Sequence, residues 1–133
     1  MISCIVKQLL RALSYMHSLG IIHRDIKLEN IVFLNNVNYK EAYVPIKIID
    51  FGTAVKTAQK ITQNFPIAGT LSYLPPEVMK GILVDRSDIW SSGVLMYILL
   101  TGISPFRGRN EVETRRNIND KNIANEPALL GLS

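Results

Sequence analysis

The stretch formed by residues 89–99 constrains the fold most, because its large apolar side chains surround a helix on nearly every side. A helix that is apolar all round is buried in a protein core or in a membrane. The longest uninterrupted apolar run, residues 94–100, is far too short to cross a bilayer, so we expect a core helix. Asp85 and Asp88 are candidate N-terminal caps, and Gly102 is expected to end the helix.

Two further helices are predicted from spacing and caps. Apolar residues recur at helical spacing over residues 2–16 and form one stripe, and Gly20 supplies a C-terminal stop. A coiled-coil or partner-binding stripe is the rival interpretation, but a buried run follows the stripe at once, which favours a core helix. Asn110 and Glu113 resemble a capping box that begins a helix reaching to about Ile118.

Two short strands are predicted between these helices. Residues 31–34 and 46–49 are rich in β-branched side chains, and the stretch that separates them is polar. We therefore expect an α+β fold, mainly helical, with a short β-hairpin. The 133 residues, 47% of them hydrophobic, suffice for one domain with a real core.

The polar residues around this hairpin form a set suited to phosphoryl transfer. Asp25, Lys27 and Asn30 fall in one short loop, and Asp50 follows the second strand. They supply a proton acceptor, a fixed cation and two oxygen ligands for a hard metal such as Mg²⁺. Phosphoryl transfer is catalysed mainly by positioning and charge neutralisation, which is what such a set provides.

These residues also carry a resemblance to eukaryotic-type protein kinases, specifically to their C-terminal lobe. Four motifs occur in the order typical of that family, and together they cover residues 5–118: His23-Arg24-Asp25-Ile26-Lys27-Leu28-Glu29-Asn30, Asp50-Phe51-Gly52, Gly69-Thr70 with Pro75-Pro76-Glu77, and Asp88-Ile89-Trp90-Ser91-Ser92-Gly93. Because all four motifs occur in the order typical of the family, a chance match by a non-kinase domain is remote.

The resemblance implies a role for each candidate residue. Asp25 is expected to accept the proton of the attacking hydroxyl, and Lys27 to neutralise charge on the transferred phosphate of ATP. Thr70 is expected to touch both of them, and Lys27 with Thr70 is typical of the serine/threonine branch. Asn30 and Asp50 are the expected Mg²⁺ ligands.

Other family positions imply structural support and regulation. His23 and Phe51 are expected to pack together, and Asp88 to hold the backbone of the catalytic loop, residues 23–30. Arg24 would normally bind a phosphate in the activation loop, residues 53–72. The usual acceptor position is Pro66, which carries no hydroxyl, so control by phosphorylation there is not expected. Thr57 and Thr62 remain as alternative acceptors or as ordinary solvated side chains.

Parts of a complete kinase domain are missing from the sequence. It contains no glycine-rich phosphate loop and no lysine in a V-A-I-K context. We therefore interpret residues 1–133 as a partial kinase domain without the N-terminal lobe, and expect the chain alone to be inactive. The alternative is a pseudokinase-like module that binds proteins without phosphotransfer. Surface exposed by truncation could support self-association.

Within the family, several stretches are most similar to calcium/calmodulin-regulated and calcium-dependent protein kinases: residues 46–50, 97–102 and 105–108. No D-x-D-x-D-G loop occurs, so direct calcium binding is not expected.

The net charge and the cysteine content indicate which classes of partner and which cellular location to expect. A formal charge of +4 is a mild excess without the dense basic stripe of a nucleic-acid-binding protein. The expected partners are ATP and a protein substrate, with no nucleic acid and no membrane. Cys4 is the single cysteine, so an internal disulfide is impossible, which fits a reducing, cytoplasmic location.

Overall fold

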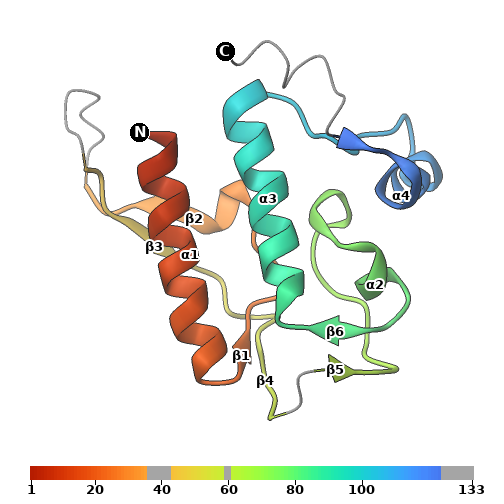
Figure 1. The fold of residues 1–133 in the computed structure, drawn as a ribbon, viewed down its shortest axis with the longest axis horizontal. Helices are drawn as coiled ribbons and strands as arrows, with labels where there is room; N and C mark the ends of the chain where they lie inside the picture. The colour runs from red at the N-terminus through yellow and green to blue at the C-terminus, as the bar shows by residue number, and fades with distance from the viewer. Residues whose placement is uncertain (36–42, 59–60, 124–133) are drawn as a thin grey trace.

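Two long helices form the centre of the protein. In the computed structural model, which describes residues 1–35, 43–58 and 61–123, α1 (Ile2–Ser18) and α3 (Arg86–Thr101) lie side by side (Figure 1). Leu9 and Leu13 of α1 and Leu95 of α3 are fully buried in the shared core. The helix predicted to be apolar all round is therefore a core helix, as expected. Among the described residues, no helix has the length and hydrophobicity needed to span a bilayer.

The ends of these helices agree with the sequence signals in part. Gly102 ends α3 in the left-handed conformation, with φ of 77°, and its amide donates to the carbonyl oxygen of Ile98. Asp85 occupies the N-cap position of α3, but its side chain makes no capping hydrogen bond. The Asp88 side chain, the other candidate cap, binds backbone amides of a distant loop instead.

The predicted hairpin is present. Strand β2 (Ile31–Phe33) pairs with β3 (Ile46–Ile48) in an antiparallel ladder, with Ile31 opposite Ile48 and Phe33 opposite Ile46. Most of the polar connection between them, residues 36–42, lies outside the described residues. The confirmed fold class is α+β, mainly helical, with small antiparallel sheets.

Two further pairings were not predicted, because their strands are only two residues long. Strand β1 (Ile21–Ile22) pairs with β4 (Val55–Lys56), and β5 (Ile61–Thr62) pairs with β6 (Leu83–Val84), both antiparallel. Both β4 and β5 belong to residues 53–72, the expected activation loop, for which no strand was predicted. The two pairings attach this segment to the rest of the fold at two points.

The remaining elements follow the activation loop. The short helix α2 (Pro76–Met79) lies before β6, and α4 (Glu111–Asp120) follows α3 (Figure 1). The Asn110 side chain accepts a hydrogen bond from the Glu113 amide at 2.9 Å, which confirms the predicted cap. The reciprocal contact differs from a capping box, since the Glu113 carboxylate accepts from the Arg109 amide at 2.7 Å.

Candidate active site

A buried carboxylate from α3 organises the catalytic loop. Asp88 is 1% exposed, and its oxygens accept hydrogen bonds from the backbone amides of His23 and Arg24, each at 2.9 Å. One of the same oxygens lies 2.8 Å from Nε2 of His17 near the end of α1. The expected support of this loop by Asp88 is therefore seen in the structure. It holds the turn in which Arg24 adopts the left-handed φ of 72°.

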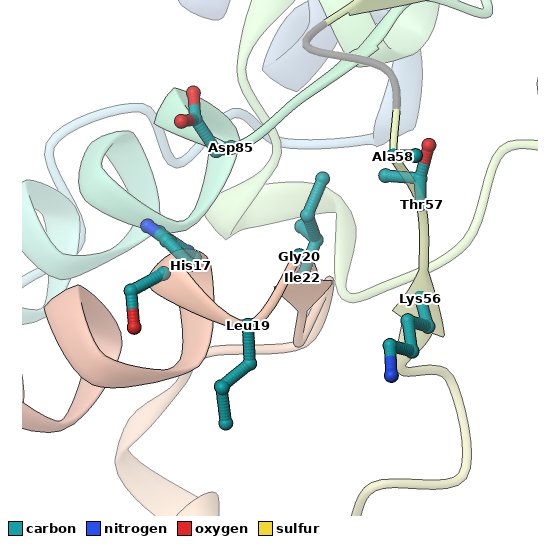
Figure 2. A pocket seen from close by; sticks show the side chains of 9 residues that line it. His17, Leu19, Gly20, Ile22, Lys56, Thr57, Ala58 and Asp85 are labelled. Carbon is teal, nitrogen blue, oxygen red and sulfur yellow. The ribbon is translucent and has the colours of Figure 1, made fainter.

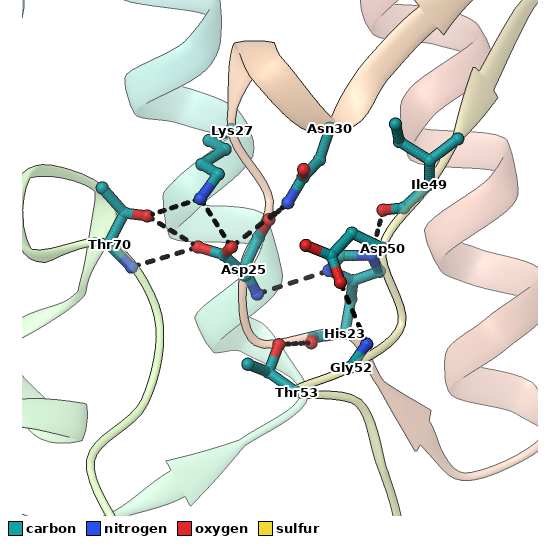
Figure 3. Close-up of polar contacts among 9 residues, drawn as sticks. All are labelled: His23, Asp25, Lys27, Asn30, Ile49, Asp50, Gly52, Thr53 and Thr70. Carbon is teal, nitrogen blue, oxygen red and sulfur yellow. Dashed lines mark hydrogen bonds and ion pairs between the residues drawn. The ribbon is translucent and has the colours of Figure 1, made fainter.

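The Asp25 side chain is the centre of a cluster of polar contacts (Figure 3). One carboxylate oxygen lies 2.7 Å from Nζ of Lys27. The other accepts from the hydroxyl and the amide of Thr70, at 2.8 and 3.1 Å. Nζ of Lys27 also donates to the Thr70 hydroxyl at 2.9 Å, so the three residues form a closed triangle. The structure brings together the three residues predicted to be catalytic.

The contacts within this cluster change the pKa values of Asp25 and Lys27. Burial alone would raise the pKa of Asp25, but the hydrogen bonds from Lys27, Thr70 and Asn30 and the charge of Lys27 outweigh it and lower the pKa. The hydrogen bond to Asp25 raises the pKa of Lys27, and the nearby carboxylates add to this effect. At neutral pH the cluster is an ionised carboxylate facing an ammonium group.

Thr70 reaches Asp25 because the preceding residue is a glycine. Gly69 has a φ of 106°, and a Cβ at this position would collide with the carbonyl oxygen of Arg24. Only glycine combines this conformation with so close an approach of two backbones. The activation loop therefore meets the catalytic loop through backbone contact, and the Thr70 hydroxyl is placed by it.

The hairpin brings Asn30 close to Asp50. Asn30 precedes β2, Asp50 follows β3 after Ile49, and the Ile49 amide donates to the Asn30 carbonyl oxygen at 2.9 Å. The Asn30 side-chain amide donates to the carbonyl oxygen and the carboxylate of Asp25, at 2.8 and 3.2 Å. Its Oδ1 is thus the atom left to bind a cation. The Asp50 carboxylate is exposed and accepts from the Gly52 amide at 3.2 Å.

These donors fit one magnesium ion that is shared with phosphates. An amide oxygen and a carboxylate are hard ligands, and Mg²⁺ in nucleotide sites is held by one or two side chains plus phosphate oxygens. Within the described part of the chain, no three histidine, cysteine or acidic side chains gather closely enough to hold a metal unaided. The donor set is therefore suited to a metal that arrives with ATP. It is not that of a self-sufficient metal centre.

His23 and Phe51 pack as expected. Their ring centroids are 4.9 Å apart in an edge-on arrangement, and Nε2 of His23 lies 3.1 Å from the carbonyl oxygen of Ile49. His23 is fully buried. The imidazole therefore joins the catalytic loop to the strand that leads to Asp50, which is a structural role.

Two supporting residues were missed by sequence reasoning. His17 binds Asp88, and the Thr53 hydroxyl donates to the His23 carbonyl oxygen at 3.0 Å. His17 lies in the last turn of a helix that ends beside the catalytic loop, and this position is a signal that could have indicated its role. Nothing in the sequence around Thr53 indicates its contact, because the two segments are 30 residues apart.

A cavity of about 570 Å³ lies beside the end of α1 (Figure 2). Its lining includes His17, Gly20, Lys56 and Asp85, and none of the five candidate site residues lines it. This cavity therefore does not mark the candidate site, which is located instead by the convergence of polar groups on Asp25.

Several known proteins are similar in sequence to this chain over most of its length. The most similar relatives include "Calcium-dependent protein kinase 5" of Plasmodium falciparum (isolate 3D7), 44% identical over 114 residues, and "Calcium-dependent protein kinase 4" of the same organism, 40% identical over 116. Each alignment covers 86% of this chain but only 19% and 21% of the relative. "Myosin light chain kinase family member 4" of Mus musculus is 45% identical over 116 residues, covering 85% of this chain and 28% of that protein.

These matches confirm the resemblance to calcium-dependent protein kinases that the sequence motifs indicated. The chain spans about a fifth of the length of the Plasmodium relatives, so it corresponds to one part of such proteins. Residues 1–129 match the family described as "Protein kinase domain". The chain belongs to the protein kinase family.

Proposed function

We propose that this chain is the catalytic region of a serine/threonine protein kinase, which transfers the γ-phosphate of ATP to hydroxyl groups of proteins. The observation that carries the proposal is the buried Asp25 carboxylate, held by Lys27, Thr70 and Asn30 at 2.7 to 3.2 Å. A general base must be fixed within reach of the proton that it accepts, and these contacts fix it.

Each of the three clustered residues has a distinct role in this proposal. Asp25 orients the substrate hydroxyl and accepts its proton as the bond to phosphorus forms. Lys27 is a positive charge fixed next to Asp25, where it can stabilise the negative charge of the phosphate in transit. Thr70 ties both to the activation loop, so the base is in place only when that loop is docked. The pair Lys27 and Thr70, and the printed names of the relatives, support serine or threonine as the substrate residue.

Asn30 and Asp50 would hold Mg²⁺, which when bound neutralises charge on the ATP phosphates. Paramagnetic Mn²⁺ tests this assignment, because it broadens the NMR signals of amides close to it. We expect the amide signals of Asn30, Asp50 and Gly52 to broaden when Mn²⁺ and ATP are added together, and the signals of α4 to stay sharp. Broadening elsewhere, or none with both ligands present, would contradict the metal site.

The isolated 133-residue chain is expected to transfer phosphate very poorly or not at all. Its sequence contains no glycine-rich loop to cover the ATP phosphates and no V-A-I-K lysine to bind them. A radiolabelled ATP assay with serine, threonine and tyrosine peptides should show no incorporation above that of an Asp25→Asn variant. Incorporation that depends on Asp25 would show that the chain is active by itself, and would support the base assignment while refuting the expected inactivity.

ATP and a protein substrate are the proposed partners, and a second copy of the chain is a further one. An apolar groove between α1 and α3 leaves Leu10, Met96 and Leu100 between 38% and 41% exposed. A contiguous apolar surface of this kind favours association in water. With a lone cysteine, the composition also supports a cytoplasmic location.

A further inference from the structure

The guanidinium group of Arg24 connects both ends of the activation loop to the catalytic loop. Nη1 donates to the carbonyl oxygen of Thr53 at 3.2 Å, and Nη2 donates to the carbonyl oxygen of Pro66 at 2.6 Å. Cζ lies 4.6 Å from the centroid of the Phe65 ring. One side chain therefore contacts residues 13 positions apart in the loop, at its beginning and near its end.

The groups that contact the guanidinium here are all neutral. In the part of the chain that the structure describes, no carboxylate forms an ion pair with the Arg24 side chain, although Asp88 binds its backbone amide. Partial burial lowers the pKa of Arg24, and the charge of Asp88 offsets this in part. Carbonyl oxygens accept hydrogen bonds from the guanidinium and an aromatic face attracts its charge, so these neutral groups stabilise the cation.

The end of the activation loop is also held by backbone pairing. The Phe65 amide donates to the Gly81 carbonyl oxygen at 2.9 Å, just beyond the pairing of β5 with β6. Pro66 follows, and three residues later Gly69 packs against the Arg24 backbone and leads into Thr70. Any displacement of Phe65 and Pro66 is therefore passed along a very short stretch to the contact between Thr70 and Asp25.

We propose that Phe65 is a positioning residue whose ring, together with the Pro66 carbonyl oxygen, holds Arg24 and keeps Thr70 docked on Asp25 without phosphorylation of the activation loop. The relevance of this to catalysis rests on the proposed kinase function. The docking itself is a property of the fold and can be measured without any assay of activity.

Amide hydrogen exchange followed by NMR tests the proposal on the whole chain after phosphatase treatment, with mass spectrometry confirming that no phosphate remains. Phe65→Leu keeps an apolar side chain but removes the aromatic face. We expect the amides of residue 65 and Thr70, each corrected for its intrinsic exchange rate, to exchange about tenfold faster in this variant, the change expected for the loss of a partly desolvated cation–π contact. Phe65→Trp should restore slow exchange, because indole binds cations well.

Two controls separate positioning from general loss of stability. Ile67→Ala removes an exposed apolar side chain from the same loop and should leave both amides unchanged. The Leu95 amide in the core reports global unfolding and should stay constant in every variant. In an Arg24→Gln background, Phe65→Leu should add less than a twofold change, because two residues that act through one contact are not additive.

Two results would overturn the proposal. In the first, Phe65→Leu exchanges no faster than unphosphorylated wild-type protein at the two amides, so the Phe65 ring does not hold the loop. In the second, Phe65→Leu has the same effect with and without Arg24, so the ring does not act through the guanidinium. These results leave the kinase proposal untouched, because that proposal is tested separately, by the broadening that Mn²⁺ and ATP cause at Asn30 and Asp50. Failure of metal binding with the exchange pattern intact would refute only the proposed function.

Discussion

At the scale of single residues, the ionisation of Asp25 and Lys27 couples the candidate site to the stability of the fold. The pKa of Asp25 is lowered below its ordinary value of 3.8, so its carboxylate stabilises the folded state above that pH. The contribution is lost as the pH falls from 3.8 through the folded pKa. The raised pKa of Lys27 acts in the opposite direction: its contribution is present below the ordinary value of 10.5 and is lost as the pH rises through the folded pKa.

We therefore expect Asp25→Asn to lower the free energy of unfolding by about 2 kcal/mol near neutral pH, the value of charge-assisted hydrogen bonds. The difference from wild type should shrink as the pH falls from 3.8 through the lower folded pKa, below which the carboxylate is protonated in both states. Urea unfolding at a series of pH values measures this difference in the free energy of unfolding. Asp120→Asn, which changes an exposed carboxylate on α4, is the matched control. A difference that is independent of pH would refute the link to ionisation.

Asp88 is the residue whose loss should damage the fold most. Its carboxylate accepts from two backbone amides and lies against His17, and it is almost fully buried. We predict that Asp88→Asn lowers the free energy of unfolding by about 3 kcal/mol, since an amide group cannot accept from all three partners. Thermal unfolding measures the stability of Asp88→Asn beside that of the control Asp85→Asn. Asp85 is an exposed neighbour without a capping bond, so its substitution should change stability by less than about 0.5 kcal/mol. Equal effects of the two variants would count against the assignment.

At the scale of secondary structure, the elements with a strong local signal were the ones predicted. The stripe over residues 2–16, the all-apolar helix and the two strands of the hairpin follow directly from side-chain spacing, and each is present. Strands β1, β4, β5 and β6 are two residues long, too short to produce a pattern, and their pairing depends on partners far apart in the sequence. The candidate site residues came from motifs, whereas their mutual contacts depend on the backbone approach of Gly69 to Arg24, which no spacing reveals.

Helix α4 gives an element-scale prediction. The Asn110 side chain caps it by accepting from the Glu113 amide. Replacing Asn110 by alanine should cost about 1 kcal/mol of stability, as the loss of an N-cap usually does. Chemical unfolding measures this loss of stability. The control is Asn119→Ala, an exposed change in the last turn of the same helix. If Asn110→Ala were as well tolerated as Asn119→Ala, the cap would have no energetic role.

At the scale of the whole molecule, the groove between α1 and α3 is expected to govern solution behaviour. Met96 lies in this groove and is 41% exposed. Met96→Glu adds a charge to the apolar surface and should reduce concentration-dependent self-association, measured by sedimentation velocity. Val112→Glu, which changes a side chain that is 78% exposed on α4, should not. A wild-type chain that stays monomeric at high concentration would contradict the expected self-association.

We propose that the chain folds into a site for ATP and magnesium around Asp25, Asn30 and Asp50. Calorimetric titration of Mg·ATP into the purified chain tests it most directly, beside Asp50→Asn and the exposed control Asp120→Asn. We expect saturable binding that Asp50→Asn weakens about tenfold or more, as expected for loss of one charged ligand, and that Asp120→Asn leaves unchanged. Absence of binding in the wild-type chain, or binding that Asp50→Asn does not weaken, would contradict it.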